Sequence, residues 1–331
     1  MSRRLVAHAC ALAAALLSLP LIAQTSTAAK VKAAGTVWRT PRTPEGQPDL
    51  QGTWTNTTIT PLERPAELAG KAYLTEAEAA AWEKKTLATQ TGDRRDGGPE
   101  ADVARSYNEF WRDRGTKVVG SRRTSLIADP ADGKIPALTP QAQKKLAETA
   151  AYSRLHATDG PENRNLWERC LTRGLPMLPG PYNNDFEIVQ GPGYVAILHE
   201  MIHDVRVIPL DGRPHLPPSI TQWFGDPRGH WEGDTLVVDT TNFSPETNFR
   251  GASDRLHLIE RFTRVAPDEI RYEFTVDDPT TFTRVWKAEI PMYPAEGRIF
   301  EYACHEGNYA LADILRGARA QEKAASAATK Q

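Results

Sequence analysis

The chain has 331 residues, a formal net charge of −2 at pH 7, 40% hydrophobic residues and 25% charged residues. This length, with eight tryptophans, is enough for a large core, and 25 prolines with 23 glycines require many turns without approaching the composition of collagen or of a disordered chain. The near-neutral charge argues against nucleic acid as a partner, because phosphate binding needs a clustered basic face.

The N-terminus carries an export pattern. Arg3 and Arg4 precede an apolar run from Leu5 to Ala23, and small residues follow it. We interpret residues 1–24 as a cleaved signal peptide; a membrane anchor is the alternative, which Pro20 and the small residues disfavour. No later segment has the ~20 apolar residues that a membrane span needs. The mature protein is therefore expected to be periplasmic or secreted.

Signal cleavage would remove Cys10 and leave Cys170 and Cys304. An even number of cysteines in an oxidising compartment favours a disulfide. Cys170 precedes the predicted strands and Cys304 closes them, so a Cys170–Cys304 bridge would join the two ends of one domain. Two separate buried thiols are the alternative.

Residues 25–165 are expected to form an extended and helical region that packs on a β domain. Thr75, followed by Glu76 and Glu78, predicts a helix through Lys85. Residues 90–102 are polar and rich in glycine, which is typical of a loop, and residues 107–114 predict a helical turn. A threonine before Pro140 predicts a second helix that ends near residue 155.

Residues 166–316 have the pattern of a β-rich domain, and residues 317–331 that of a disordered tail. Short apolar runs between turn residues predict strands at 186–190, 194–210 (one or two strands), 235–240, 256–265, 270–276, 282–290 and 299–304. Sequential strands with short connections favour a mainly β fold: an antiparallel up-and-down barrel or strongly curved sheet, lipocalin-like, with an N-terminal helical or irregular wrap.

Two charged residues are in phase with apolar neighbours on the predicted strands, where every second side chain lies on one face. Glu260 alternates with Leu258, and Arg284 alternates with Trp286. The strand between them presents an apolar or aromatic set, Ile270, Tyr272, Phe274 and Val276. An interior charge is costly unless it is paired or bound. The alternatives are a structural Glu260–Arg284 ion pair and a polar anchor for a ligand in an aromatic-lined cavity.

Residues 199–203, His-Glu-Met-Ile-His, match the H-E-x-x-H zinc motif formally. That motif requires a helix, whose residues four apart share one face. Here the β-branched flanks favour a strand, in which positions four apart lie ~13 Å from each other and cannot share one metal. We therefore expect a hairpin turn near residues 202–204, and a zinc-protease helix is the disfavoured alternative.

An acid, a base and a cation nevertheless lie within seven residues there, which suits general acid–base chemistry. The candidate catalytic set is His199, Glu200, His203, Arg206, Glu260 and Arg284. A histidine would act as the base, a glutamate as its partner and an arginine as the anion stabiliser. No cofactor is predicted, and a divalent metal held by histidines from several strands is the alternative. Four more histidines fall in or beside the β region: His215, His230, His257 and His305.

The string from Trp231 to Thr240, Trp-Glu-Gly-Asp-Thr-Leu-Val-Val-Asp-Thr, predicts a tight turn into a returning strand. With residues 48–54, 211–215 and 301–304, this string resembles a family of exported, mostly uncharacterised bacterial proteins. The resemblance covers most of the mature chain and carries no catalytic assignment to these positions. Gly52-Thr53-Trp54 is more weakly similar to lipocalin-type barrels.

Three functions follow as hypotheses. The first is an exported acid–base enzyme, a lyase, isomerase or hydrolase, that acts on a small organic or sugar-like substrate. The second is a non-catalytic binding protein for an apolar ligand, oriented by Glu260 and Arg284. The third is an extracytoplasmic interaction module. A histidine–carboxylate group with perturbed pKa values in a cleft would favour catalysis, whereas one ion pair beneath aromatic rings would favour binding.

Overall fold

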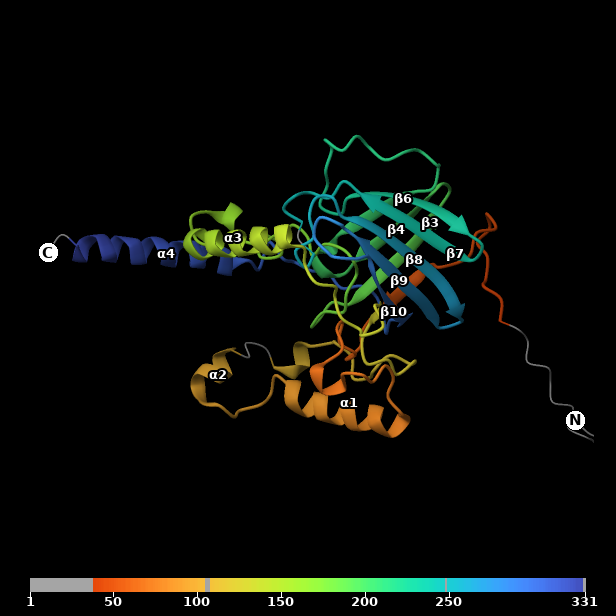
Figure 1. The fold of residues 1–331 in the computed structure, drawn as a ribbon, viewed down its shortest axis with the longest axis horizontal. Helices are drawn as coiled ribbons and strands as arrows, with labels where there is room; N and C mark the ends of the chain where they lie inside the picture. The colour runs from red at the N-terminus through yellow and green to blue at the C-terminus, as the bar shows by residue number, and fades with distance from the viewer. Residues whose placement is uncertain (1–37, 105–107, 248, 330–331) are drawn as a thin grey trace, which may run out of the picture. The chain divides into compact units, whose positions relative to one another are not determined.

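The fold is described from a computed structural model, which describes residues 38–104, 108–247 and 249–329 (Figure 1). The predicted signal peptide lies outside these residues. The strands are β1 (Gly52–Thr55), β2 (Ile127–Asp129), β3 (Asp185–Gly191), β4 (Tyr194–His199), β5 (Val205–Pro209), β6 (Asp226–Glu232), β7 (Thr235–Thr241), β8 (His257–Ala266), β9 (Glu269–Asp277) and β10 (Trp286–Pro294). They form one sheet in the order β5-β4-β3-β1-β10-β9-β8-β7-β6, and β2 also pairs with β10. The predicted mainly β fold is confirmed: an antiparallel sheet nearly closed into a barrel.

The barrel has a seam between its first and last strands. Every pairing from β5 round to β6 is antiparallel. Eight antiparallel steps separate the two strands, so β5 and β6 run in the same direction. The chain must therefore travel back along the barrel between them, and residues 210–225 make that crossover. Within the described ranges, no hydrogen-bonded ladder joins β5 to β6.

The middle of the seam is closed by packing. A Cβ added to Gly229 of β6 would lie 2.8 Å from Ile208 Cγ2 and 2.6 Å from Leu210 Cδ2, so the glycine lets these strands approach closely. This contact divides the seam into two halves. Each half contains a pocket, as described below.

The helices are α1 (Glu76–Gln90), α2 (Gly98–Ala104), α3 (Pro140–His156) and α4 (Tyr309–Ala328), with short 3-10 helices at Ala66–Leu68, Glu109–Trp111, Pro161–Asn163 and Met201–His203. The two longer helices predicted in the first half are confirmed. Thr75 forms a capping box with Glu78 at the start of α1, and Thr139 caps α3 ahead of Pro140. None of the described helices is long and apolar enough to cross a membrane.

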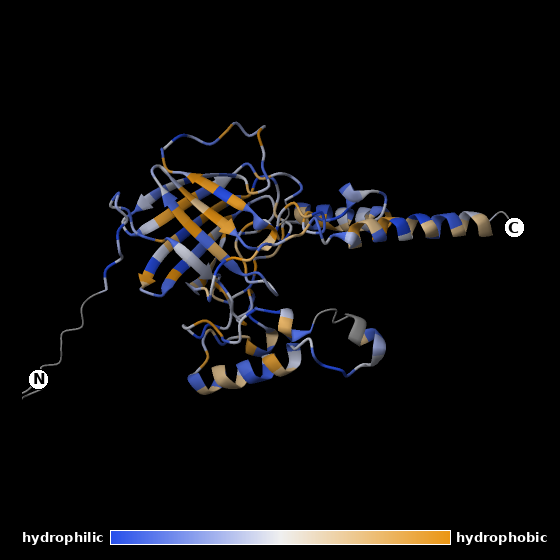
Figure 2. Ribbon diagram, turned by 180° about the vertical axis from the view of Figure 1, so that it is seen from behind, coloured by the Kyte–Doolittle hydropathy of each residue, from blue (hydrophilic) through white to orange (hydrophobic). Residues whose placement is uncertain are grey.

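The barrel interior holds the core, and apolar and polar residues alternate along its strands (Figure 2). Tyr272, Phe274 and Trp286 are among its largest fully buried side chains. The predicted inward set of β9, which is Ile270, Tyr272, Phe274 and Val276, is buried. Each such aromatic or aliphatic side chain contributes roughly 1.5–3 kcal/mol through burial. The predicted tight turn before Thr235 is also present, and Gly233 there has a φ of 62°.

Three predictions were wrong. Arg284 precedes β10 in a bend that follows the turn at Asp278; its side chain is exposed and pairs with Asp129, so there is no Glu260–Arg284 pair. Residues 299–304 form no strand, because they lead to the disulfide that joins Cys170 to Cys304, itself a confirmed prediction. The tail expected to be disordered belongs mostly to α4, which Asn308 caps.

Candidate functional site

A buried ion pair spans the barrel interior between β5 and β8. The Arg206 guanidinium donates from Nη1 to Glu260 Oε1 (3.0 Å) and from Nη2 to Oε2 (2.6 Å). Neither side chain has exposed surface. The hydroxyl of Tyr272 donates to Glu260 Oε1 (2.8 Å) and accepts from the backbone N–H of Met177 (3.2 Å). Strand alternation places Glu260 inward between Leu258 and Phe262, as the sequence predicted, but its cation comes from β5.

The electrostatics of this cluster follow from burial. Burial, followed by the charge of Glu260, raises the pKa of Tyr272 well above its usual value, so the phenol stays protonated and donates. The bidentate contact with the guanidinium and the Tyr272 bond occupy the Glu260 carboxylate. A carboxylate held in this way is poorly placed to act as a general base.

His199, at the end of β4, lies inside the barrel and is 4% exposed. Burial, followed by the positive charge of Arg206, lowers the pKa of His199 to about 3, so the imidazole is neutral. Its ring packs against Phe186 and Phe224, at centroid distances of 5.0 and 5.3 Å. His199 Nε2 and Arg206 Nε have no hydrogen-bond partner in the part of the chain that the structure describes. Buried polar atoms are nearly always paired, so these two unpartnered nitrogens are exceptions in the barrel interior.

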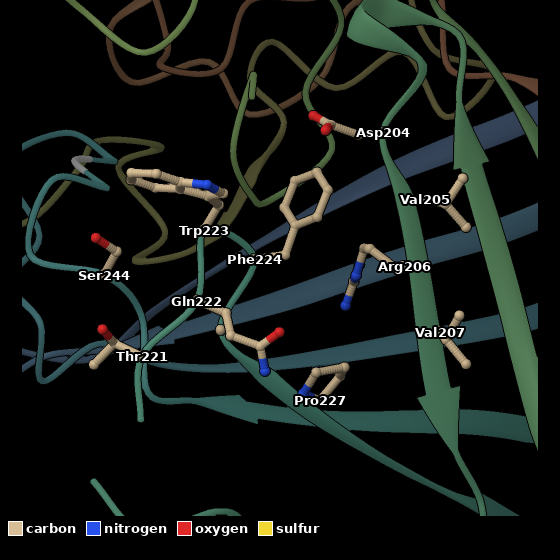
Figure 3. Close-up of a pocket in the computed structure, with 11 residues that line it drawn as sticks. Asp204, Val205, Arg206, Val207, Thr221, Gln222, Trp223, Phe224, Pro227 and Ser244 are labelled. Carbon is tan, nitrogen blue, oxygen red and sulfur yellow. The ribbon is translucent and has the colours of Figure 1, made fainter. Parts of the chain in front are cut away.

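A cleft of about 550 Å³ lies beside this cluster, in one half of the seam (Figure 3). The first residues of β5, residues 221–225 of the crossover, Pro227 and Ser244 line it. Arg206 and Phe224 belong to the lining, and Phe224 also contacts the His199 ring. Phe224 is therefore the side chain through which the cleft adjoins His199.

The cleft also exposes main-chain groups of β5. His199 N donates to Asp204 O, and Leu210 N donates to Gly193 O. In an antiparallel pair the hydrogen-bonded positions alternate, so the N–H and C=O groups of Val205 and Val207 point away from β4. They face the seam and supply donors and acceptors along one wall of the cleft.

The remaining predicted site residues lie elsewhere. The main chain from residue 199 to 203 is no α-helix: Ile202 and His203 have φ values of 63° and 47° in the turn between β4 and β5. The expected turn there is confirmed. The His203 side chain is exposed, with Nδ1 2.9 Å from the Tyr302 carbonyl oxygen. Arg284, on the surface, is also outside the cluster. The structure thus brings together His199, Arg206 and Glu260 and separates the other three.

Glu200 belongs to a separate carboxylate cluster with Asp113 and Asp185, whose oxygens lie within 4.8 Å of one another. Glu200 also accepts from Phe300 N (2.9 Å). Burial raises the pKa of both Glu200 and Asp185, and a neighbouring carboxylate adds to each shift. Oxygen ligands of this kind suit Ca²⁺ or Mg²⁺ more than zinc. Sequence reasoning missed this cluster, because Asp113 lies far along the chain from the predicted strands.

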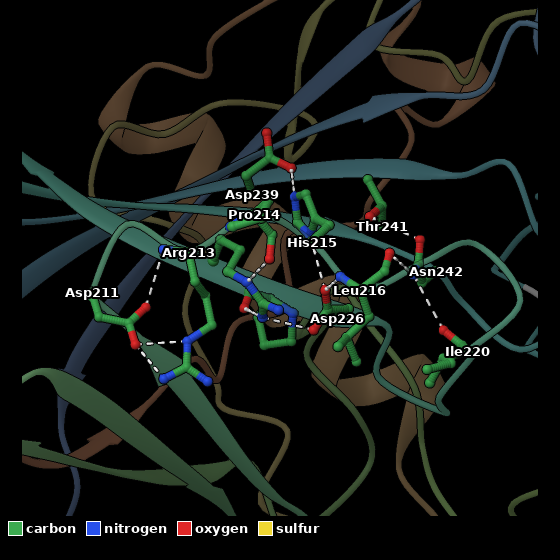
Figure 4. Close-up of polar contacts among 12 residues, drawn as sticks. Asp211, Arg213, Pro214, His215, Leu216, Ile220, Asp226, Asp239, Thr241 and Asn242 are labelled. Carbon is green, nitrogen blue, oxygen red and sulfur yellow. Dashed lines mark hydrogen bonds and ion pairs between the residues drawn. The ribbon is translucent and has the colours of Figure 1, made fainter.

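Sequence reasoning also missed a histidine–carboxylate network (Figure 4). Asp239 of β7 contacts His215 Nε2 through Oδ1 (2.9 Å) and His257 Nε2 through Oδ2 (2.8 Å). His215 Nδ1 lies 3.2 Å from Asp226 Oδ2. The hydrogen bond from His257 is the main cause that lowers the pKa of Asp239, and the same bond raises the pKa of His257. These side chains are on the outer face of the sheet.

No protein-family model matches the chain, and no curated protein or solved structure matches it.

Proposed function

We propose that the mature protein is an exported, non-catalytic binding protein for a small, largely apolar molecule. The ligand enters the cleft at the seam, packs against Trp223 and Phe224, and places one polar group against His199 and Arg206. The observation that carries this proposal is a pair of buried, unpartnered nitrogens: Arg206 Nε, whose side chain lines the cleft, and His199 Nε2, whose ring packs against the lining residue Phe224. Pockets with apolar walls and a few convergent polar groups are typical of small-molecule sites.

Binding has more support than acid–base catalysis. His199 has no carboxylate partner among the described residues, and Glu260 is occupied by Arg206 and Tyr272. One ion pair beneath aromatic rings is the arrangement expected of a binding site. The histidines that do contact carboxylates lie outside the barrel interior: His156, His215, His230 and His257.

The charges at the site define the polar group of the ligand. Arg206 and Glu260 cancel each other and His199 is neutral, so a charged group would lose its hydration without a free counter-ion. Arg206 Nε–H can only donate, whereas His199 Nε2 donates or accepts according to its tautomer. An uncharged carbonyl or hydroxyl oxygen meets both requirements. We therefore propose an aromatic or aliphatic ketone, amide, alcohol or phenol as the ligand class.

The proposal of export combines the N-terminal pattern with the disulfide. Cys170 and Cys304 are bonded, and such bonds persist in oxidising compartments. A periplasmic or secreted protein would meet its ligand there.

The test is a ligand screen by tryptophan fluorescence, with apolar ketones, amides, alcohols and phenols and their carboxylate analogues. We expect at least one uncharged member to bind, His199→Phe and Phe224→Ala to weaken it tenfold or more, and the carboxylate analogue to bind less tightly. His257→Gln changes a histidine on the outer face and is the matched control. Equal affinity in the parent and in folded His199→Phe would refute the proposed site.

A further inference from the structure

A second, smaller pocket of about 260 Å³ occupies the other half of the seam. The turn between β3 and β4, residues 43–47 and the ends of β5 and β6 line it, and it shares no lining residue with the first cleft. The packing of Gly229 against Ile208 and Leu210 lies between the two. The second pocket is thus a separate site and does not extend the cleft.

Two buried polar atoms of the lining residues have no hydrogen-bond partner among the described residues: Thr43 Oγ1 and Trp231 Nε1. Thr43 is 7% exposed, and its main chain is already bonded, since its N–H donates to Gln47 O and its C=O accepts from Gly46 N. Of the polar groups of Thr43, only the side-chain hydroxyl has no partner among the described residues. A buried indole N–H normally donates to an acceptor, so the lining residues include one obligatory donor and one hydroxyl that have no partner among the described residues.

The rest of the lining is aromatic and amide-rich. Tyr194 lies across the turn, because a Cβ added to Gly191 would fall 2.4 Å from the ring carbon Cζ. Gln47 and Gln190 belong to the lining, but the side-chain amide of Gln190 is already bonded to Leu50 N and Pro48 O. No lysine or arginine lines the pocket. Glu45 is the single carboxylate of the lining and His230 its single imidazole, so an anionic ligand would meet no permanently charged cation. The volume is just below the roughly 300–1,000 Å³ of drug-sized sites, which suits a single ring.

We propose that this pocket binds one uncharged sugar ring, either a free monosaccharide or the terminal ring of a glycan. Such a ring presents hydroxyl oxygens that accept from Trp231 Nε1–H and exchange hydrogen bonds with Thr43 Oγ1. Its C–H faces suit the aromatic walls, since aromatic faces carry partial negative charge. The proposal rests on different residues from those of the proposed function and stands or falls separately.

The test is isothermal titration of the purified mature protein with neutral monosaccharides (glucose, galactose, mannose, xylose and N-acetylglucosamine), with glucuronate and glucose 6-phosphate as anionic members, and with a glycan array. We expect at least one neutral ring to bind in one or both formats and the anionic members to bind at least tenfold more weakly. Binding to arrayed glycans without binding to free sugars would identify a glycan terminus as the ligand.

Two substitutions remove the unpartnered atoms and keep the shape. Trp231→Phe removes the indole N–H, and Thr43→Val replaces the hydroxyl with a methyl group. Each is expected to weaken binding about fivefold to tenfold, and Trp223→Phe in the other cleft is expected to leave it unchanged. If Trp231→Phe fails to fold, Thr43→Val tests the proposal by itself, because Thr43 lies outside the strands and its substitution leaves the sheet intact. No binding of any neutral sugar by the folded parent, or unaltered binding by Thr43→Val, would overturn the proposal.

Discussion

At the scale of single residues, Arg206 and Glu260 hold opposite charges with no exposed side-chain surface. Removal of one partner leaves the other charge buried and unpaired, which costs about 3–5 kcal/mol. We therefore expect Arg206→Met to lower the free energy of unfolding by this amount. The double variant Arg206→Met with Glu260→Leu is expected to fall within about 2 kcal/mol of the parent, because similar-sized apolar residues can replace a buried pair. Urea unfolding at pH 7 measures both, and a double variant as unstable as the single one would contradict this account.

The ionisation of Asp204 makes the stability of the folded protein depend on pH, and its direction follows from the pKa. Burial raises its pKa from 3.8 to about 6. Because the pKa is higher in the folded state, the contribution of the Asp204 carboxyl group to stability is complete below about pH 4 and is lost as the pH rises through about 6. Partial exposure reduces the full effect to about 1–2 kcal/mol.

Asp204→Asn removes this ionisation and keeps an oxygen that can accept from Arg173 N. We expect the variant to be about 1–2 kcal/mol more stable than the parent at pH 7.5 and equal to it at pH 4. Denaturant unfolding across this range is the measurement. A difference that stays constant with pH would show that Asp204 acts through its contacts and not through its charge.

At the scale of elements, alternation within a strand was readable from the sequence, whereas pairing between strands was not. The inward position of Glu260 followed from its neighbours in β8. The identity of its partner, Arg206, could not be predicted in this way. The left-handed turn at Ile202 and His203 shifts the inward–outward alternation, so that odd-numbered His199 and even-numbered Arg206 both face inward. Arg284 was misassigned since the turn at Asp278 delays the start of β10. The His215–Asp239 contact joins residues that only the crossover brings together.

The crossover itself, residues 210–225, is held to β6 and β7 by the contacts of His215 with Asp226 and Asp239. The groups around it are Arg228 on Asp226 and, beyond Asp239, His257 with Asp277. The hydrogen bond with Asp239 raises the pKa of His257, so the stabilisation that this bond gives to the same network is present at low pH and is lost as the pH rises through the raised pKa.

We therefore expect amide hydrogen exchange in residues 210–225, corrected for intrinsic rates, to accelerate about fivefold between pH 5.5 and 8.5, which corresponds to one lost hydrogen bond. Asp239→Asn should remove most of this dependence. His230→Gln is the control, since within the described ranges the polar side-chain contact of His230 is with the exposed Glu232 and not with the crossover. An equal acceleration in Asp239→Asn would mean that the crossover is held by other contacts, such as those of Asn242 with its carbonyl groups.

At the scale of the whole molecule, the disulfide encloses the part of the chain that contains β3 to β10. The two cysteines are 134 residues apart in the sequence, and closure of a loop of this length restricts the unfolded chain by up to about 5 kcal/mol. The bond also borders the start of α4: the side chain of Asn308, which caps that helix, donates to Glu168 O and to Cys170 Sγ. The same contact therefore ties the C-terminal helix to the beginning of the β-rich region.

We expect Cys170→Ala with Cys304→Ala to lower the free energy of unfolding by about 3–5 kcal/mol. Because the first cleft lies at the seam and includes neither cysteine, ligand affinity at folding-permissive temperature should be unchanged. Urea unfolding of the oxidised parent, the reduced parent and the double variant separates the effects, since the last two lack the same bond. If all three unfold at the same urea concentration, strand packing alone would hold the barrel, and the bond would serve only to fix the position of Asn308 at α4.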